Sequence, residues 1–292
     1  MTWLQLKLAT TRDDTEALED ALLAAGAVSV TLQDNADQPI LEPGVNETPL
    51  WDQVKLTGLF NADINTQQTT ALAEQSFGGK LPNTRWEQLE DKDWERTWMD
   101  NYHPIQCGER LWICPSWLEP PQAEAVNLML DPGLAFGTGT HPTTFLCLQW
   151  LERQDLKGKT VLDYGCGSGI LGIAALLLGA EKVVAVDNDP QALIATKDNL
   201  NRNKLNEAQL ETYLPEETPE IVADILIANI LAAPLISLAP TLKQHLQENA
   251  PICLSGILSH QASDVAQAYE PEYPLTASGE RENWIRLCNS GT

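Results

Sequence analysis

The chain has 292 residues, enough for one large domain or two unequal ones. Its 43% hydrophobic and 20% charged residues are ordinary for a globular protein and argue against global disorder. No apolar run approaches the roughly 20 residues that cross a bilayer. The N-terminal residues do not resemble a signal peptide either, so we expect a cytoplasmic protein that binds no membrane.

The formal net charge of −23 argues against direct nucleic-acid binding, because lysine and arginine must neutralise phosphates there. It favours a basic macromolecular partner, since complementary charge steers encounter. A charge that serves only solubility is the alternative. The six cysteines have no C-x-x-C spacing, so we expect reduced packing residues and no metal site.

The first part of the chain predicts a ferredoxin-like domain over residues 1–89. Leu4, Leu6 and Leu8 alternate with polar neighbours, as in a half-buried strand, and an apolar helical stripe then runs up to Gly26. Further strands are predicted at 27–33, 54–60 and 84–89, and a second helix at 66–76. The order is β-α-β-β-α-β, the split-βαβ pattern. Residues 90–104 predict a linker helix with tryptophans on one face, or else a plain surface helix.

From residue 105 onward the pattern changes to alternating strands and helices. Short strands are expected at 111–114 and 126–130. They are followed by strand–helix pairs at 160–163 and 170–178, 182–187 and 190–203, 223–229 and 234–247, and 251–255 and 259–269. Such repeats predict a parallel sheet covered by helices, a Rossmann-like α/β domain over 105–292. The tail, 273–277 and 283–287 around Gly279, predicts an antiparallel hairpin at the sheet edge.

The glycine-rich turn after the strand at 160–163 is the strongest signal. Asp163, Gly165, Gly167 and Gly169 alternate with other residues, and a helix follows at once. Glycines allow a tight turn and close ligand approach, and the helix N-terminus favours a carboxylate or phosphate. The same segment also matches the dinucleotide fingerprint G-x-G-x-x-G.

Two side chains discriminate between the possible ligands. Asp163 would repel a pyrophosphate but suits the ammonium group of S-adenosylmethionine, whose carboxylate suits the helix end. Asp187, at the tip of the next strand, can accept hydrogen bonds from both hydroxyls of a ribose, which both cofactor classes contain. We therefore favour S-adenosylmethionine, with a nicotinamide or flavin cofactor and a structural turn as the alternatives.

Two further segments carry candidate site residues. Asn229 ends an apolar strand at the edge where open α/β sheets bind ligands, and its carbonyl oxygen could accept a hydrogen bond from an amine about to be methylated. A plain strand cap is the alternative. The loop at 131–144 is rich in glycine and lacks the Gly-Lys-Ser/Thr of a P-loop. Within it His141 is a possible general base, although capping of the helix that Pro142 opens is favoured.

The chain resembles the ribosomal protein L11 methyltransferase family over essentially its full length. The resemblance rests on DPGLAFGTGTHPTT at 131–144 and DYGCGSG at 163–169, with LEDKDWE at 89–95, LWICPSW at 111–117 and LSGIL at 254–258. It implies a class I methyltransferase domain behind a ferredoxin-like domain that grips ribosomal protein L11. The family holds the donor with residues matching Thr144, Gly165, Asp187 and Asn229, and we add Asp163 and Gly167.

The resemblance also implies that the N-terminal amine and several lysines of L11 are methylated, reached by means of a mobile linker. Two rival functions remain. A dehydrogenase would need a nicotinamide-facing catalytic residue, and none is evident. A non-enzymatic assembly or chaperone-like protein would only hold a basic client.

Overall fold

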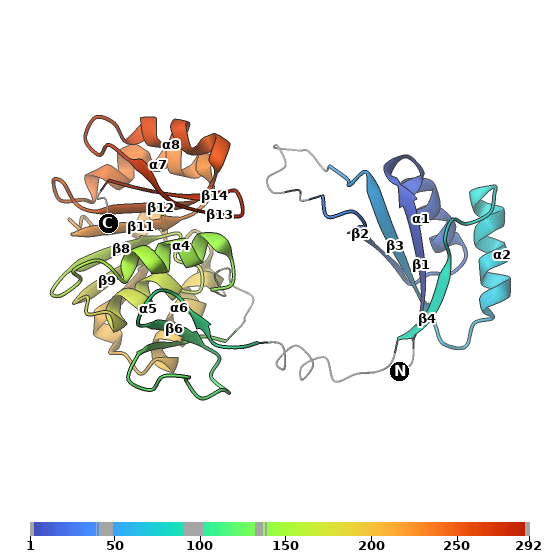
Figure 1. Cartoon of the computed structure of the whole chain (residues 1–292), viewed down its shortest axis with the longest axis horizontal. Helices are drawn as coiled ribbons and strands as arrows, with labels where there is room; N and C mark the ends of the chain where they lie inside the picture. The colour runs from blue at the N-terminus through green and yellow to red at the C-terminus, as the bar shows by residue number, and fades with distance from the viewer. Residues whose placement is uncertain are drawn as a thin grey trace. The chain divides into compact units, whose positions relative to one another are not determined.

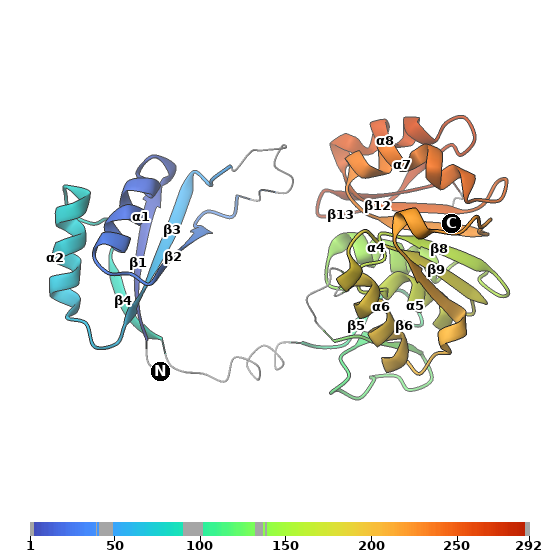
Figure 2. The same ribbon diagram turned by 180° about the vertical axis from the view of Figure 1, so that it is seen from behind.

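The computed structural model describes residues 3–38, 40, 49–89, 102–131, 137 and 139–289. The chain divides into two compact units, residues 1–99 and 100–292, each of which is described by itself (Figures 1 and 2). The predicted linker helix at 90–104 falls mainly on residues outside the described ranges; residues 102–104 are neither helix nor strand. Within the described ranges, none of the helices combines the length and apolar character needed to cross a lipid bilayer.

The N-terminal unit is a four-stranded antiparallel sheet in the order β2-β3-β1-β4. Its strands are β1 (Trp3–Thr11), β2 (Ser29–Asp34), β3 (Gln53–Asn61) and β4 (Arg85–Leu89), and its helices are α1 (Thr15–Ala24) and α2 (Thr66–Phe77). This order and connectivity confirm the predicted ferredoxin-like arrangement.

One face of this sheet packs against both helices. Alternate side chains of β1 and β3 are buried, and they form a core with apolar residues of α1 and α2. The Asn65 side chain caps α2 by accepting from the amides of Gln67 and Gln68, and Gly78 ends the helix in the left-handed region. The alternation of apolar and polar residues in β1 and β3 therefore identifies the face of the sheet that packs against the helices.

The second unit is built on a seven-stranded sheet in the order β10-β9-β8-β11-β12-β14-β13, parallel except for β14. Its strands are β8 (Thr160–Tyr164), β9 (Lys182–Val186), β10 (Leu210–Tyr213), β11 (Ile225–Asn229), β12 (Ile252–Leu258), β13 (Thr276–Arg281) and β14 (Trp284–Cys288). The predicted Rossmann-like α/β class, with a mostly parallel sheet and an antiparallel C-terminal hairpin, is confirmed.

Helices cover both faces of this sheet (Figure 1). One face packs against α4 (Pro142–Leu151), α5 (Ile170–Leu177) and α6 (Pro190–Arg202), together with a small sheet of β5 (Ile105–Gln106), β6 (Leu111–Cys114) and β7 (Val126–Met129). The other face packs against α7 (Ala232–Gln244) and α8 (Ala262–Tyr269). Because both faces are covered, the central strands read as continuous apolar runs.

Several details differ from the sequence-based expectation, among them the two-residue strand β5, which was not predicted. The edge strand β10 was missed, because it is only four residues long and has one fully buried side chain. Gly279 does not form the C-terminal turn but lies within β13, beside an irregularity in its pairing with β14. The turn is Glu282–Asn283, both with positive φ (53° and 67°). Two such residues make a hairpin turn whose twist suits the flanking strands, and the glycine misled the prediction.

Candidate functional site

The predicted site residues gather at the carboxyl edge of the large sheet, where its order reverses. Strands β8, β9 and β10 progress in one direction, whereas β11 and β12 progress in the other. Asp163 lies near the end of β8, Asn229 ends β11, and Asp187 directly follows β9. Ligands of open α/β sheets bind at such a switch point.

The turn between β8 and α5 requires its glycines. Gly165 has φ of 78° and donates its amide hydrogen to the carbonyl of Val186 at 2.7 Å. Gly169 has φ of 77° and is the N-cap of α5. A residue with a side chain would be strained at these backbone angles, which is why glycine occupies both positions. The hydrogen bond from Gly165 keeps the turn close to the end of β9.

Asp163 ties this loop to the start of α5. Its Oδ2 accepts a hydrogen bond from the Gly172 amide at 2.9 Å, while its Oδ1 is buried and has no partner. Burial raises the pKa of Asp163 to about 7; the Gly172 hydrogen bond opposes the shift and the nearby Asp187 adds to it. A buried carboxyl with an unused oxygen is suited to a cationic N–H donor.

Asp187 closes the loop from the other side. Its Oδ2 accepts from the Gly167 amide at 2.8 Å and its Oδ1 from the Asp189 amide at 3.0 Å. Each carboxylate oxygen keeps a further lone pair, and the side chain is only partly buried, so a vicinal diol can still bind. The Gly167 amide, in contrast, is already occupied by Asp187.

Asn229 and Thr144 are neighbours in the structure. The Asn229 Nδ2 donates to the Thr144 Oγ1 at 3.3 Å, and the Asn229 Oδ1 is buried without a partner. Thr144 itself is fully buried on α4. The pair therefore leaves one amide oxygen, with its orientation fixed, as an unused acceptor.

The start of α4 shows what His141 does. Its Nδ1 accepts from the Thr143 amide at 3.3 Å and lies 2.7 Å from the Thr143 Oγ1, so the ring caps the helix. Burial lowers the pKa of His141, with Glu282 opposing the shift. Capping, the favoured interpretation, is confirmed. Residues 132–136 and 138 of the preceding loop lie outside the described ranges.

Several supporting residues were missed by the sequence analysis. The Thr196 Oγ1 donates to the Gly167 carbonyl at 3.1 Å, the Asn199 Nδ2 to the Ser168 carbonyl at 2.8 Å, and the Ser168 Oγ to the Gly137 carbonyl at 2.7 Å. Thr196 and Asn199 are buried polar residues spaced three apart on α6. Polar residues on the buried face of a helix indicate specific hydrogen bonds, and this pattern in α6 could have identified Thr196 and Asn199.

Cys166, the cysteine within the glycine turn, is a packing residue. It is buried, and burial is the main reason why the pKa of its thiol is raised. Its Sγ lies 3.4 Å from the Thr196 Oγ1. All six cysteines are free and buried, which confirms the expectation of reduced packing residues.

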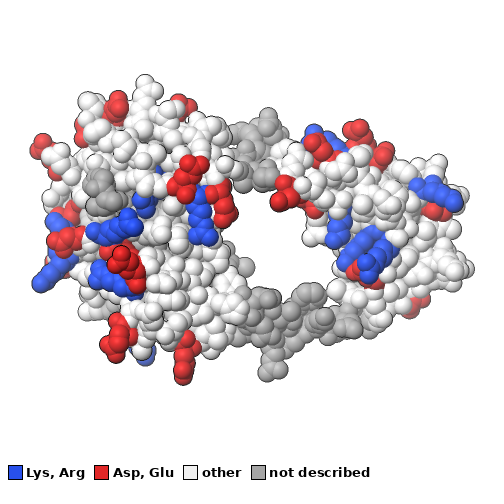
Figure 3. All heavy atoms as spheres, in the orientation of Figure 1, with Lys and Arg blue, Asp and Glu red and all other residues white. Residues whose placement is uncertain are grey.

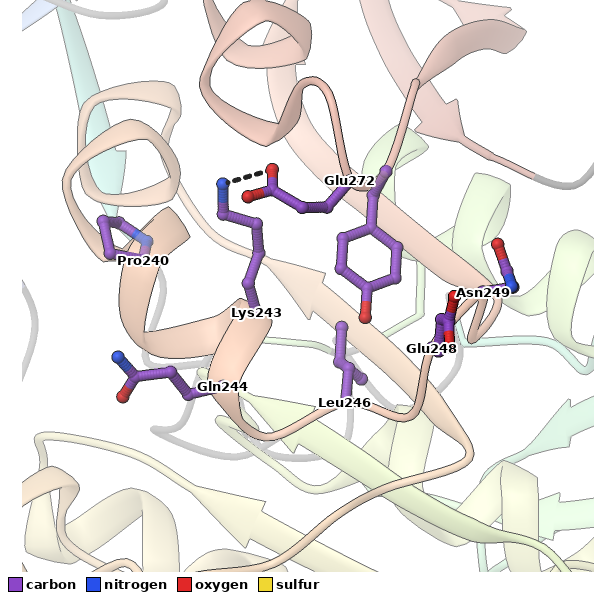
Figure 4. A pocket seen from close by; sticks show the side chains of 8 residues that line it. Pro240, Lys243, Gln244, Leu246, Glu248, Asn249 and Glu272 are labelled. Atoms are coloured by element: carbon purple, nitrogen blue, oxygen red, sulfur yellow. Dashed lines mark hydrogen bonds and ion pairs between the residues drawn. The ribbon is translucent and has the colours of Figure 1, made fainter.

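A cavity elsewhere in the second unit is not part of this site. It has a volume of about 660 Å³ and is lined by Pro240, Lys243, Gln244, Leu246, Glu248, Asn249, Glu272 and Tyr273. Lys243 and Glu272 point toward one another across it and form an ion pair of 3.0 Å (Figure 4). The Tyr273 hydroxyl donates to the Gln247 carbonyl. The cavity lies at the C-terminal end of α7, away from the glycine turn.

The charged side chains of the described residues are interspersed on the face shown in Figure 3, where both signs occur on both units. At the site itself, two buried acceptor oxygens and the Asp187 carboxylate surround a helix N-terminus. The acceptor oxygens suit a nucleoside that carries an ammonium group, and the helix N-terminus suits its carboxylate. The carboxylates of the site disfavour a pyrophosphate.

Known proteins agree with this geometry. The family model for ribosomal protein L11 methyltransferase matches residues 2–291. A ribosomal protein L11 methyltransferase from Cellvibrio japonicus is 62% identical over 98% of both chains, and one from Saccharophagus degradans is 54% identical over 99% of both. The solved L11 methylase of Lactobacillus delbrueckii subsp. bulgaricus is 35% identical, with a TM-score of 0.58, over 65% of this chain and all of that one. The chain is therefore an S-adenosylmethionine-dependent methyltransferase and belongs to the ribosomal protein L11 methyltransferase family.

Proposed function

We propose that the chain transfers methyl groups from S-adenosylmethionine to the N-terminal amine and lysine amino groups of ribosomal protein L11. Family membership supports the donor and the substrate. The observation that carries the acceptor chemistry is the unpartnered Asn229 Oδ1, buried at the carboxyl edge of the sheet where the strands of Asp163 and Asp187 also end. An amide oxygen in that position suits an amine that keeps an N–H bond to donate.

The donor would be held by Thr144, Gly165, Asp187 and Asn229, with Asp163 and Gly167 completing the loop. Asp187 would bind the ribose hydroxyls, and the free oxygen of Asp163 would accept from the ammonium group. Gly165 permits close approach of the ligand to the main chain, and Gly167 acts through its hydrogen bond to Asp187. When bound, the donor supplies an already activated methyl group, so the protein mainly aligns the reacting groups.

The acceptor amine must lose a proton before it can attack. A lysine with pKa of about 10.4 requires about 4 kcal/mol for this near pH 7.4, whereas an α-amine with pKa of about 7.8 requires under about 1 kcal/mol. Burial of the amine against the site lowers its pKa by desolvation. Asn229 then orients the neutral amine, and no dedicated base is required.

The N-terminal unit would recruit the substrate. Its exposed acidic side chains at the start of α1 suit a basic protein, and we expect no direct nucleic-acid binding. A cytoplasmic location is part of the proposal, because that is where a ribosomal protein is available.

Mass spectrometry of purified L11, after incubation with the chain and isotopically labelled donor, tests the proposal. We expect label on the N-terminal amine and on lysines. Asn229→Ala should reduce turnover by roughly a hundredfold, the effect of losing substrate alignment, while donor affinity changes much less.

Unlabelled L11 after incubation with the wild-type chain would contradict the proposed substrate. A variant in which donor binding collapses while turnover per bound donor is unchanged would instead show that Asn229 serves only the donor. Thr143→Ser provides the control. Thr143 precedes Thr144 on α4, but the hydrogen bond of Asn229 is to Thr144.

A further inference from the structure

Strand β12 contains a bulge close to the proposed acceptor site. Its pairing with β14 shifts register between Leu254 and Ile257, and Gly256 within the bulge has φ of 83°. The Ser255 Oγ donates to the Ile285 carbonyl at 3.0 Å and pins the bulge to β14. Bulges occur often beside active sites, where they redirect the chain.

Gly256 lies directly against the main chain of Ile230. A Cβ atom at Gly256 would lie 2.3 Å from the Ile230 carbonyl oxygen, 2.7 Å from its carbonyl carbon and 3.1 Å from its nitrogen. These are backbone atoms and cannot rotate away, so any larger residue at Gly256 must displace the peptide of Ile230. Ile230 immediately follows Asn229.

The side chain of Ile230 packs against the glycine turn between β8 and α5. A Cβ atom at Gly165 would lie 2.2 Å from the Ile230 Cγ2. Asn229 is fixed at the same time, because it is in register with Ser255 across β11 and β12 and its amide bonds to Thr144. Ile230, the residue after Asn229, thus lies against two glycines of positive φ: its side chain against Gly165 and its main chain against Gly256 of the β12 bulge.

We infer that Gly256 is a positioning residue for the acceptor amine: the β12 bulge sets the Asn229–Ile230 main chain and thereby aims the Asn229 Oδ1. This inference rests on the proposed role of Asn229. Gly256 needs no contact with donor or substrate, because its effect is transmitted through the backbone of Ile230. A displacement of about 1 Å at such a point lowers turnover by roughly a hundredfold.

Gly256→Ala is the direct test, with Gly158→Ala as the matched control. Gly158 also has positive φ (69°) and lies in the same unit, but a Cβ atom there meets nothing closer than a Glu181 carboxylate oxygen at 3.9 Å. Both variants carry the strain of an alanine at positive φ. Only Gly256→Ala should lower kcat for methylation of L11, by roughly a hundredfold, with the Kd of the donor within about threefold of wild type.

A double-mutant cycle with Asn229→Ala separates positioning from general damage. If Gly256 acts through Asn229, Gly256→Ala should add little to the loss already caused by Asn229→Ala. Ser255→Ala removes only the hydrogen bond to Ile285 and should displace the β12 bulge less. If Gly256→Ala does not fold, Ser255→Ala replaces it in the double-mutant cycle.

Several results would overturn the inference: an additive loss in the cycle, an equal loss for Gly158→Ala, or unchanged turnover for both bulge variants. Failure of the proposed function looks different. If Asn229→Ala alone kept full turnover, the role of Asn229 would be refuted, and the positioning role of Gly256 would fall with it. If Asn229→Ala lowered turnover and Gly256→Ala lowered it independently, only the inference about Gly256 would be wrong.

Discussion

The two units differ in where they keep their polar groups. In the N-terminal unit, the buried polar side chains of the described residues are threonines, and the charged groups lie at the surface. The catalytic unit buries ionisable and amide groups in its interior, among them Asp163, Glu152, Asn199 and Arg286. Its buried side-chain atoms without partners include two oxygens at the predicted site, Asp163 Oδ1 and Asn229 Oδ1, together with the Nε1 atoms of Trp112 and Trp150. Buried polar groups without partners destabilise a fold, so the two oxygens at the sheet edge call for an explanation, and the proposed ligand supplies one.

Under the proposed function, the two units would contribute to activity in different ways. The catalytic unit places specific atoms at a sheet edge, and substitution of single residues should have large effects. The N-terminal unit presents a surface, whose individual charges should each have small effects. The following predictions test this contrast.

Asp187→Ala should have the largest effect. It removes the acceptor of the proposed ribose and also the anchor of the Gly167 amide. Hydrogen bonds to charged groups contribute about 1.5–3 kcal/mol each, so donor affinity should fall at least about a hundredfold. Isothermal titration calorimetry measures this. Asp189→Ala is the control, since that side chain caps α6 through the Gln191 amide; an equal loss there would refute the assigned role of Asp187.

Asp163 should make donor binding depend on pH. Its pKa is raised to about 7 in the folded protein, so the native state holds a proton that the unfolded chain releases at a pKa of about 3.9. The contribution of Asp163 to the free energy of unfolding is therefore greatest below about pH 4, and it is lost as the pH rises toward about 7. An ammonium ligand prefers the carboxylate, so donor affinity should rise by up to about tenfold per pH unit below about pH 7.

Asp163→Asn should abolish that rise, because a carboxamide does not titrate yet can still accept from the Gly172 amide. Donor titrations at several pH values measure the slope. A variant that retained the wild-type slope would show that another group takes up the proton.

Neutralising the exposed acids at the start of α1 should have a moderate effect. Replacement of Asp13, Asp14, Glu16 and Asp20 by their amides should raise the KM for L11 about threefold at low salt and lose its effect at high salt, where exposed charges are screened. Four exposed acids of the other unit provide the control: Glu207, Glu248, Asp264 and Glu270. An identical change for both sets would show that net charge, rather than the N-terminal unit, recruits L11.

His141→Asn should have the smallest effect. Asparagine is a good N-cap, so the variant should keep α4 and its turnover, whereas His141→Ala should lower the free energy of unfolding by about 1 kcal/mol. Thermal unfolding and turnover are measured in parallel. A folded His141→Asn variant without activity would restore the general-base interpretation.

The sequence predicted the fold well where patterns are local. Leu6 and Leu8 alternate with half-buried neighbours in β1. Asp163, Asp187 and Asn229 stand at or beside the carboxyl ends of parallel strands, which meet at one edge of the sheet. The parallel sheet covered by helices follows from the alternation of strands and helices.

What the sequence did not reveal depends on contacts between distant residues. The contact of Gly256 with Ile230 arises only from the register of β12 and its bulge, which no short motif encodes. The hydrogen bond between Asn229 and Thr144 likewise joins two elements far apart in the chain. The C-terminal turn was misplaced because Glu282 and Asn283 adopt positive φ without a glycine.

The most direct test of the central claim is a crystal structure of the chain with S-adenosylmethionine or its demethylated product. We predict density against the turn from Asp163 to Gly169, with the sugar hydroxyls on the Asp187 carboxylate and the amide oxygen of Asn229 facing the sulfur atom or its methyl group. Ligand density at another place, or a crevice closed by side chains at saturating ligand, would contradict it.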